Sequence, residues 1–580
     1  MLFGRYVNRF YLRYIHLFIL GIIALLFVDY YQLEIPEVVR DITNGLKDGT
    51  LTISTLNDLV KILLIVLVVM FVGRFLWRVT LFGVGVKIEN NLRASMFDHQ
   101  LKLSEQYYQD HKTGALMALY TNDLMTIRQA FGVGTVMLVD VLFLGTLALY
   151  KMFNINVLLT ILSTIPMLCL ALCGGIIGKY MKMKFEARQK SYEDLSDFVQ
   201  ENFSGISVIK AFVKETIELR EFKKKSQNYM DKNIAFVKFA TLLEVLISLF
   251  ISSIMLVIIG YGSYLVYHSK MDIGTLTEFF SYFMSLVWPM MAIGQLINMR
   301  SQANASLKRI NELLDEKIDI TDKNVITKEL DGSIRFNNFS FKYPDSNRYV
   351  LKDINLEIKP GMMVGIIGRT GSGKTTLVKS LLRYYNYEDN QLLIDDTDIM
   401  KLPFKDVRNL IGYVPQNNFL FSDTIKNNIG FAFNEVSIDD VKNAAIFADV
   451  DNNIMDFTDQ YETILGEKGV SISGGQKQRL SIARAYLKDP KILIMDDSVS
   501  AVDTITEERI IKNLREYRKN KTTIIVAHRI STIKDLDLIV LIDDGKIVKS
   551  GTHEQMLEND LYNEMVMLQK LEEEVTSNEG

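Results

Sequence analysis

Cysteine is almost absent from this chain of 580 residues, which contains only Cys169 and Cys173. Two cysteines cannot form a disulfide framework, and a four-cysteine zinc site is excluded for the same reason. The chain also lacks an excess of basic charge, because 65 Lys and Arg residues face 69 Asp and Glu residues. A nucleic-acid-binding protein needs a basic face for phosphate contacts, so the composition argues against nucleic acid as a partner.

What the chain does contain is divided between two unlike halves. Hydrophobic residues make up 48% and charged residues 23%. This average is too apolar for a disordered chain and too charged for a protein that lies wholly in a membrane. The apolar residues are concentrated in the first 300 positions.

Six stretches in the first half are long enough to cross a bilayer as helices of about 20 residues. They are 14–35, 59–82, 133–153, 157–177, 242–267 and 273–298. Arg5, Arg9 and Arg13 precede the first stretch, and the interval 178–240 is rich in Lys and Arg. The positive-inside rule therefore places the N-terminus and both long intervals in the cytoplasm. We expect helices that continue out of the membrane and turn at tips near 114–123 and 204–212.

The composition becomes polar near position 315, and the second half alternates short β-branched runs with helical patterns, which predicts an α/β domain. A strand at 363–367 is followed by the sequence GRTGSGKT and then by a helical pattern. This is a P-loop, in which glycines let backbone N–H groups wrap a nucleotide's phosphates. Lys374 is expected to reach the β- and γ-phosphates, and the Thr375 hydroxyl to bind Mg²⁺.

A second strand, 492–495, ends in Asp496 and Asp497. Adjacent residues at a strand end point to opposite faces, so the two carboxylates should have separate roles. We assign Asp496 to Mg²⁺ and Asp497 to the base that orients the attacking water. Together with the P-loop, the pair predicts a nucleotide-hydrolysing domain.

The sequence ISGGQ at 472–476, followed by an arginine-bearing helical pattern, resembles the signature motif of ABC-family ATPases. The resemblance extends to the A-loop aromatic Tyr343, the Q-loop Gln416, the D-loop at 500–503 and the switch His528. It also covers the exporter-type X-loop GEKG at 466–469, whose Glu467 is a candidate partner for the cytoplasmic tips. The ATP-binding residues that it implies are Tyr343, Gly368, Arg369, Thr370, Gly371, Ser372, Gly373, Lys374, Thr375, Thr376, Ser473, Gly474, Gly475 and Gln476. It further implies catalytic roles for Asp497, His528 and Gln416, Mg²⁺ contacts from Thr375, Gln416 and Asp496, and a D-loop role for Asp503.

The membrane half resembles the six-span domain of ABC exporters, and the whole chain resembles one half of the bacterial heterodimeric multidrug exporters of the BmrC, EfrC and LmrC kind. The resemblance implies residues 1–315 as a transmembrane domain, 316–332 as a linker, 333–572 as an ABC nucleotide-binding domain and 573–580 as a tail. It also places the protein in the bacterial plasma membrane with its ATPase domain in the cytoplasm, and implies ATP and Mg²⁺ as cofactors.

The strand 492–495 with Asp496 is the Walker B motif of this family. The residue after the Walker B aspartate is normally Glu, and this chain has Asp497. The shorter side chain withdraws the carboxylate by about 1.5 Å. We therefore expect a degenerate ATP site, and a second, non-identical half-transporter as partner. This chain's intact signature motif would complete the ATP site of that partner. A homodimer with two slow sites is the competing interpretation.

Besides the second half-transporter, the expected partners are membrane lipids and a hydrophobic or cationic small-molecule substrate. Charges inside membrane spans are functional candidates by default, and Asp29 is our candidate for a cationic substrate, with Trp288 as a cavity-lining aromatic residue. Two alternatives remain open at this point. One is a homodimeric lipid flippase or lipopeptide exporter, and the other, of a different class, is an ATP-gated channel.

Overall fold

The computed structural model describes residues 4–322, 325–466, 472–499 and 502–578. Its internal contacts divide the chain into two units. The first unit comprises Met1–Gln100 and Lys112–Asp315, and the second comprises Leu101–His111 and Glu316–Gly580. The first is helical and the second contains two β-sheets with helices, so the predicted fold class is confirmed.

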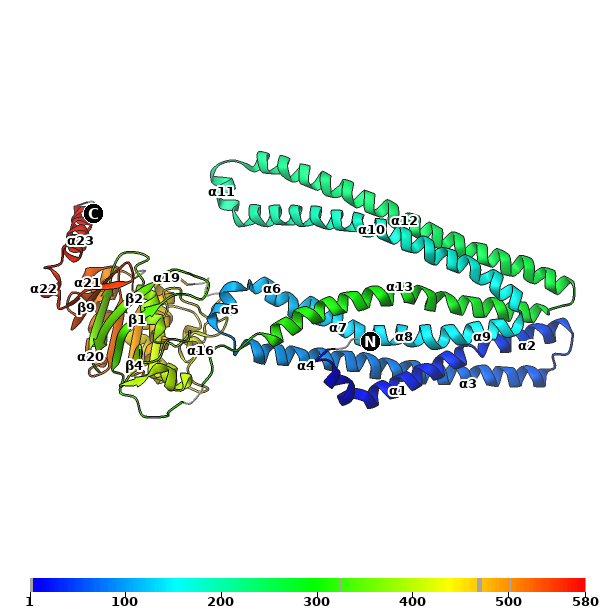
Figure 1. Cartoon of the computed structure of the whole chain (residues 1–580), viewed down its shortest axis with the longest axis horizontal. Helices are drawn as coiled ribbons and strands as arrows, with labels where there is room; N and C mark the ends of the chain where they lie inside the picture. The colour runs from blue at the N-terminus through cyan, green and yellow to red at the C-terminus, as the bar shows by residue number, and fades with distance from the viewer. Residues whose placement is uncertain (1–3, 323–324, 467–471, 500–501, 579–580) are drawn as a thin grey trace. The chain divides into compact units, whose positions relative to one another are not determined.

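Long helices run side by side in the first unit (Figure 1). Their bounds are α1 Asn8–Gln32, α2 Ile35–Lys47, α3 Ile53–Trp77, α4 Gly83–Gln100, α6 Thr113–Ala118, α7 Leu124–Phe131, α8 Val133–Val139, α9 Gly145–Ile155, α10 Val157–Ser204, α11 Ile206–Ala211, α12 Glu215–Tyr267 and α13 Ile273–Asp315. Three π-helical segments interrupt the series, η1 Arg78–Phe82, η2 Leu119–Asp123 and η3 Asp140–Leu144.

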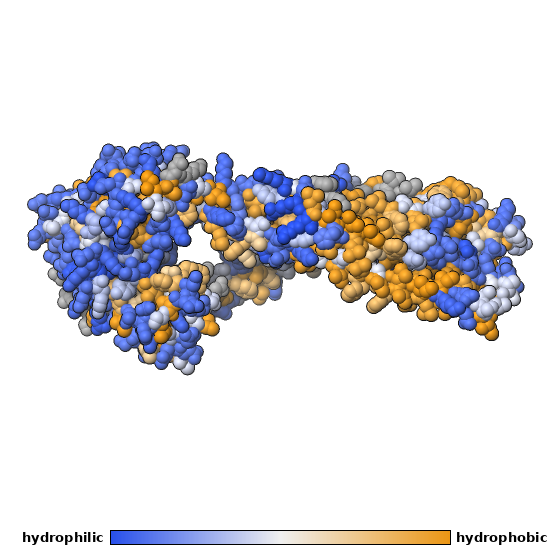
Figure 2. Space-filling model, turned by 90° about the horizontal axis from the view of Figure 1, so that it is seen from below, coloured by the Kyte–Doolittle hydropathy of each residue, from blue (hydrophilic) through white to orange (hydrophobic). Residues whose placement is uncertain are grey.

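Five continuous helical stretches of the described residues are long and apolar enough to cross a membrane. They are Asn8–Lys47, Ile53–Gln100, Thr113–Ile155, Glu215–Tyr267 and Ile273–Asp315. The predicted fourth span, 157–177, lies in α10, where Val157–Pro166 forms a shorter apolar stretch and several following side chains lie outside the described set. Hydrophobic residues gather on the surface of this helical unit (Figure 2). Because such a surface is unfavourable in water, the unit is suited to lipid.

The two cytoplasmic tips differ in how well the sequence predicted them. The second tip is the short helix α11, which joins α10 to α12 where the tip at 204–212 was expected. The first prediction, 114–123, was wrong. The chain turns earlier, at Leu101–His111, where α5 (Glu105–Asp110) lies between α4 and α6, and 114–123 is already in the returning helix. The segment Leu101–His111 contains no Gly or Pro, and the helix-forming pattern continues through it. The position of this turn could therefore not be recognised from the sequence.

The second unit contains one antiparallel and one mainly parallel sheet. The four-stranded sheet has the order β2 (Leu351–Ile358), β1 (Ile334–Phe341), β4 (Leu392–Ile394) and β5 (Thr397–Asp398). The six-stranded sheet has the order β10 (Lys546–Gly551), β9 (Leu538–Asp543), β3 (Met363–Ile367), β8 (Thr522–Val526), β7 (Ile492–Asp496) and β6 (Ile411–Val414). β7 and β8 are buried along their whole length, as expected for central strands covered on both faces.

Helices surround these strands and build the core with them. They are α14 Lys374–Ser380, α15 Phe404–Leu410, α16 Ile425–Ile429, α17 Ile438–Phe447, α18 Asp451–Met455, α19 Gly474–Leu487, α20 Thr504–Tyr517, α21 Ile530–Ile533, α22 His553–Met556 and α23 Asp560–Asn578. Two 3₁₀ turns, η4 Ile399–Lys401 and η5 Gln460–Glu462, complete the unit.

A buried arginine ties the start of the second unit to its core. The Arg383 side chain is 1% exposed and donates to Asp322 Oδ1 over 2.9 Å. It also donates to the carbonyl oxygens of Thr321 and Leu402. The Arg383 Nε has no hydrogen-bond partner among the described residues, so the buried charge is stabilised by the Nη1 and Nη2 contacts.

Replacing Arg383 with Met should therefore destabilise the second unit by about 3 kcal/mol, since the buried acceptors lose their donor. The apparent melting temperature in detergent, followed by circular dichroism, should fall by about 5–10 °C. Arg348→Met is the matched control, because Arg348 is 79% exposed and its pairing with Asp544 is a surface ion pair. Equal melting temperatures for both variants would contradict this account of Arg383.

Candidate functional site

Four loops meet at one edge of the six-stranded sheet, because they follow four strands that are neighbours in the order β3-β8-β7-β6. The P-loop follows β3, His528 follows β8, Asp496 and Asp497 stand at the end of β7, and Gln416 follows β6. Parallel strands place their carboxyl ends at the same edge, and ligands of open α/β sheets bind there. The topology therefore brings together residues that are far apart in the sequence, from Gly368 in the P-loop to His528.

The P-loop depends on glycines in conformations that other residues avoid. Gly371 and Gly373 have φ angles of +79° and +105°, and a Cβ at Gly368 would lie 2.0 Å from the Ile542 carbonyl oxygen. Lys374 is buried at the start of α14, and its Nζ donates to the carbonyl oxygens of Gly368 at 2.9 Å and Arg369 at 3.0 Å. Burial lowers the pKa of Lys374, while the charges of Asp497 and Asp496 oppose that shift. The Lys374 side chain is thus held by the backbone of the P-loop.

The loop fits a phosphate group in two further respects. Among the described residues other than its chain neighbours, none places a heavy atom within 4 Å of the position that a Cβ would take at Gly371, which leaves the backbone open to a ligand. The Ser372 hydroxyl is buried and has no hydrogen-bond partner among the described residues. Arg369 and Thr370, by contrast, are exposed on the outer part of the loop.

Asp496 and Asp497 have different partners, as their places at the strand end predicted. Asp496 is completely buried; it accepts from the Thr375 hydroxyl at 2.9 Å and from the Tyr413 hydroxyl at 3.2 Å. Burial raises the pKa of Asp496, and the two hydroxyl donors counteract that effect. A hydroxyl beside a carboxylate is the oxygen donor set that Mg²⁺ prefers.

Asp497 lies close to the other two side chains that were predicted to be catalytic. Its Oδ2 accepts from Gln416 Nε2 at 3.2 Å and lies 3.9 Å from His528 Nε2. The backbone of Asp497 adopts a φ of +50°, and its N–H donates to the carbonyl of Val526 on β8. The short carboxylate is therefore fixed beside both partners.

The A-loop and the signature motif lie in ordered local structures. The Tyr343 hydroxyl is 3.0 Å from the Thr376 hydroxyl at the start of α14. Ser473 caps α19: its hydroxyl accepts from the N–H of Gln476 at 3.2 Å, and Gln476 Oε1 accepts from the N–H of Ser473 at 3.0 Å. This capping box satisfies two backbone donors and leaves Ser473 and Gly474 exposed, with Gly475 half-buried.

Two of the remaining sequence predictions fall wholly or partly outside the described residues. Glu467 of the X-loop lies there, as do the first two residues of the D-loop at 500–503. Asp503 is described, and its carboxylate caps α20 by accepting from the N–H of Thr506 at 3.0 Å. That hydrogen bond lowers the pKa of Asp503.

Sequence reasoning missed Gln569, a residue of the C-terminal helix α23. Its amide nitrogen donates to the His528 carbonyl oxygen at 2.5 Å, and its amide oxygen accepts from the Ile530 N–H at 2.6 Å. These two bonds hold the backbone of the switch loop, residues 528–530, at positions on either side of Arg529. Because Gln569 belongs to no motif and is 41 positions from His528, no local pattern could have indicated it.

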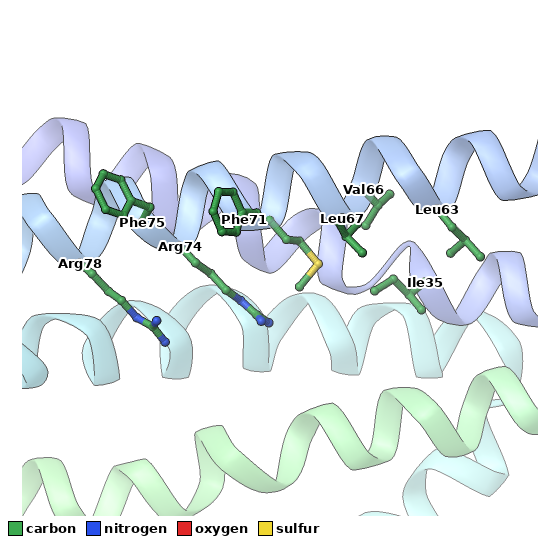
Figure 3. A pocket seen from close by; sticks show the side chains of 9 residues that line it. Ile35, Leu63, Val66, Leu67, Phe71, Arg74, Phe75 and Arg78 are labelled. Carbon is green, nitrogen blue, oxygen red and sulfur yellow. The ribbon is translucent and has the colours of Figure 1, made fainter.

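Asp29 and Trp288, the two substrate candidates, lie on different helices of the first unit. Asp29 is buried on α1, and Trp288 on α13 donates through Nε1 to Asp140 at 2.8 Å. A separate groove of about 590 Å³ runs along α3 (Figure 3). Its lining is Ile35, Leu63, Val66, Leu67, Met70, Phe71, Arg74, Phe75 and Arg78.

Comparison with known proteins supports the same assignment for both units. Residues 18–290 match the family model for the ABC transporter transmembrane region, and residues 351–500 match the ABC transporter model. The chain is 37% identical to the probable multidrug resistance ABC transporter ATP-binding/permease protein YheI of Bacillus subtilis, over 100% of this chain and 98% of that protein. It is 33% identical to the multidrug resistance-like ATP-binding protein MdlA of Escherichia coli, over 95% and 94% of the two chains.

The fold also matches that of a solved transporter. The structure of a bacterial Atm1-family ABC exporter with ATP bound superposes with a TM-score of 0.75 at 25% identity, covering 97% of this chain and 98% of that one. The predicted enzyme class and membrane location are thereby confirmed. The chain belongs to the ABC transporter family, as an ATP-hydrolysing membrane transporter that carries its transmembrane and ATPase domains in one polypeptide.

Proposed function

We propose that this chain is one half of a heterodimeric exporter that uses ATP to move amphipathic or drug-like compounds out of a bacterial cell. The names of its relatives YheI and MdlA, which refer to multidrug resistance, support the substrate class. The observation that supports the proposal of a heterodimer is Asp497, which occupies the position where a hydrolytic site of this family has Glu.

The residues around the sheet edge divide the work on ATP. Tyr343 stacks on the adenine, and the backbone from Gly368 to Thr376 surrounds the phosphates. Lys374 neutralises the β- and γ-phosphates, while Thr375, Asp496 and Gln416 hold Mg²⁺. The metal, when bound, neutralises charge that develops on the phosphate oxygens. His528 contacts the γ-phosphate and Asp497 takes a proton from the attacking water.

Asp497 limits this chain's own site because positioning dominates phosphoryl transfer. Its carboxylate is one C–C bond, about 1.5 Å, shorter in reach than that of Glu. A misplacement of about 1 Å can reduce the rate roughly 100-fold. Nucleotide binding should persist, because the P-loop and Asp496 are intact, so the site binds ATP and holds it.

The exposed surfaces favour a second subunit. Ser473 and Gly474 are exposed at the start of α19, where they would complete a partner's nucleotide site. The tip helix α11 ends beside Phe212, which is 70% exposed, and carries Val208, which is 58% exposed. Apolar side chains at a cytoplasmic tip require a cover, and a partner's ATPase domain would supply one.

The first tip gives a route from nucleotide to membrane. Glu105 on α5 accepts from Lys379 Nζ on α14 at 3.3 Å. The neighbouring Gln106 donates to Asp345, two residues beyond Tyr343. Since α14 begins at the P-loop lysine, closure of the site around ATP would move α5 and the helices that continue from it.

Replacing Asp497 with Glu should accelerate hydrolysis at this chain's own site by about 10- to 100-fold, because the carboxylate regains its reach. Hydrolysis at this site is measured by vanadate trapping of a photoreactive ATP analogue on this chain. The sample is the complex purified by means of this chain. Asp489→Glu is the matched control, since Asp489 has a 75% exposed side chain paired with Lys521. Trapping that does not rise in Asp497→Glu would show that Asp497 is not the limiting defect.

Gln569→Ala should lower this site's turnover number about threefold to tenfold and leave the KM for ATP unchanged, because the switch loop loses both of its clasping bonds. The measurement is made in the Asp497→Glu background, where this site turns over quickly. Lys570→Ala, an exposed neighbour on α23, is the control. Gln569→Glu should fall in between, as it keeps an acceptor for Ile530 but loses the donor to His528. An altered KM with an unchanged turnover number would refute this role.

A further inference from the structure

The groove along α3 in the transmembrane domain combines apolar walls with positive charge (Figure 3). Its volume of about 590 Å³ lies within the range of roughly 300–1,000 Å³ that is usual for sites of drug-sized ligands. The side chains of Leu67, Phe71 and Phe75 line the groove and are 63%, 73% and 67% exposed. Among the described residues that line it, none is Asp or Glu, whereas Arg74 and Arg78 both belong to the lining.

The two arginines are placed to act on one ligand. Arg74 belongs to α3 and Arg78 opens η1, which continues the same helix. Residues four apart on a helix lie on the same face, and both guanidinium groups extend to the same side of α3 (Figure 3). Guanidinium groups donate charge-assisted hydrogen bonds to carboxylate and phosphate oxygens. The pair is therefore suited to an acid group.

Neither arginine forms an ion pair with a carboxylate of the described residues. Arg74 Nη2 donates to the uncharged Gln32, whose Oε1 is 3.5 Å away. The guanidinium carbon of Arg78 lies 5.3 Å from the centroid of the Trp77 ring, which is a cation–π contact. The charge of Arg74 reaches Asp29 on α1, but from beyond ion-pair distance. Even with Asp29 ionised, the groove keeps a net positive charge.

The depth of the arginines in the membrane limits which anion can meet them. Residues 62–86 contain no charged side chain apart from these two, and Arg74 is at the middle of that run. A charge inside a span is costly unless it is paired. The head group of a bilayer phospholipid stays about 15 Å or more from the midplane, because the hydrocarbon core is about 30 Å thick. A small amphiphilic anion can move to this depth, so it fits the arginines better than a bilayer lipid does.

The apolar part of the groove can hold the body of such a ligand. Leu63 and Arg78 are about 22 Å apart along the helix axis at 1.5 Å per residue. Ile35, at the start of α2, lies towards the end of the groove away from Arg78 (Figure 3). An acid group at the arginines would place an alkyl or aromatic body on Phe71 and Leu67, where apolar surface of both partners is removed from contact with water.

We propose that this groove binds one small amphiphilic anion, with its acid group on Arg74 and Arg78 and its apolar body along α3. This inference rests on the proposed export of drug-like compounds, and it adds a class of compound and a location to that function. A cation is disfavoured in this groove, because both guanidinium groups repel it.

The test is equilibrium binding of dansylaminoundecanoic acid, a fluorescent amphiphile with one carboxylate. The sample is the complex purified by means of this chain in phosphatidylcholine nanodiscs, and binding to empty nanodiscs is subtracted. The methyl ester of the same compound, which keeps the apolar body without the charge, is the second probe. Arg74→Gln and Arg78→Gln should each weaken binding of the acid about tenfold and leave the ester unaffected, because a charge-assisted hydrogen bond is lost.

Two further variants test the location. Leu67→Trp should weaken binding of both probes, since the larger side chain fills the groove. Lys61→Gln is the matched control and should change neither, because Lys61 is a cation of α3 that lies outside the groove lining. Its side chain is 70% exposed and pairs with Asp58.

Three results would overturn the proposal. The first is unchanged binding of the acid in both arginine variants. The second is an equal loss of acid and ester in those variants, which would show that the arginines maintain structure rather than recognise charge. The third is loss of the arginine-dependent binding when the nanodiscs contain phosphatidylglycerol, which would identify an anionic bilayer lipid as the occupant.

ATP-driven transport of the methyl ester is measured in parallel in proteoliposomes, so that the two proposals can fail separately. Transport of the ester without arginine-dependent binding of the acid would refute only the anion site. Arginine-dependent binding of the acid without ATP-driven transport of either probe would support the site and contradict the proposed export of drug-like compounds.

Discussion

The parallel order of four strands, β3-β8-β7-β6, is the constraint on which this protein's chemistry depends. It brings the P-loop, His528, the two aspartates and Gln416 to one edge although they are far apart in sequence. β7 and β8, the two central strands of this order, are buried along their whole length, as expected for strands covered on both faces. The final position of each reactive side chain then depends only on the local conformation of its own loop.

The proposed limit on hydrolysis at this chain's own site lies in one such local conformation, that of Asp497. Asp497 is anchored through its N–H to β8 and through its carboxylate to Gln416, so it has little freedom to compensate for its shorter side chain. The signature motif shows no such defect, because Ser473 and Gln476 form a complete capping box. The proposal of an unlike partner rests on this contrast between the shortened carboxylate on the P-loop side and the complete capping box at the signature motif.

The sequence predicted those features that depend on local patterns. The P-loop, the Walker B strand and the tip at α11 follow from glycine placement, strand ends and span spacing. It could not locate the first tip, because α5 lies in a helix-like stretch without a breaking residue. Contacts over long separations were also beyond it, such as Gln569 with the His528 loop and Trp288 with Asp140. They arise from tertiary packing, which leaves no periodic trace.

The most direct test of the central claim is the subunit composition of the complex. This chain is purified from native membranes in mild detergent, and intact mass spectrometry determines what accompanies it and in what ratio. The account predicts one copy of this chain with one copy of a different six-span half-transporter that has Glu after its Walker B aspartate. A complex of two copies of this chain alone would contradict it, because Asp497 would then serve both sites.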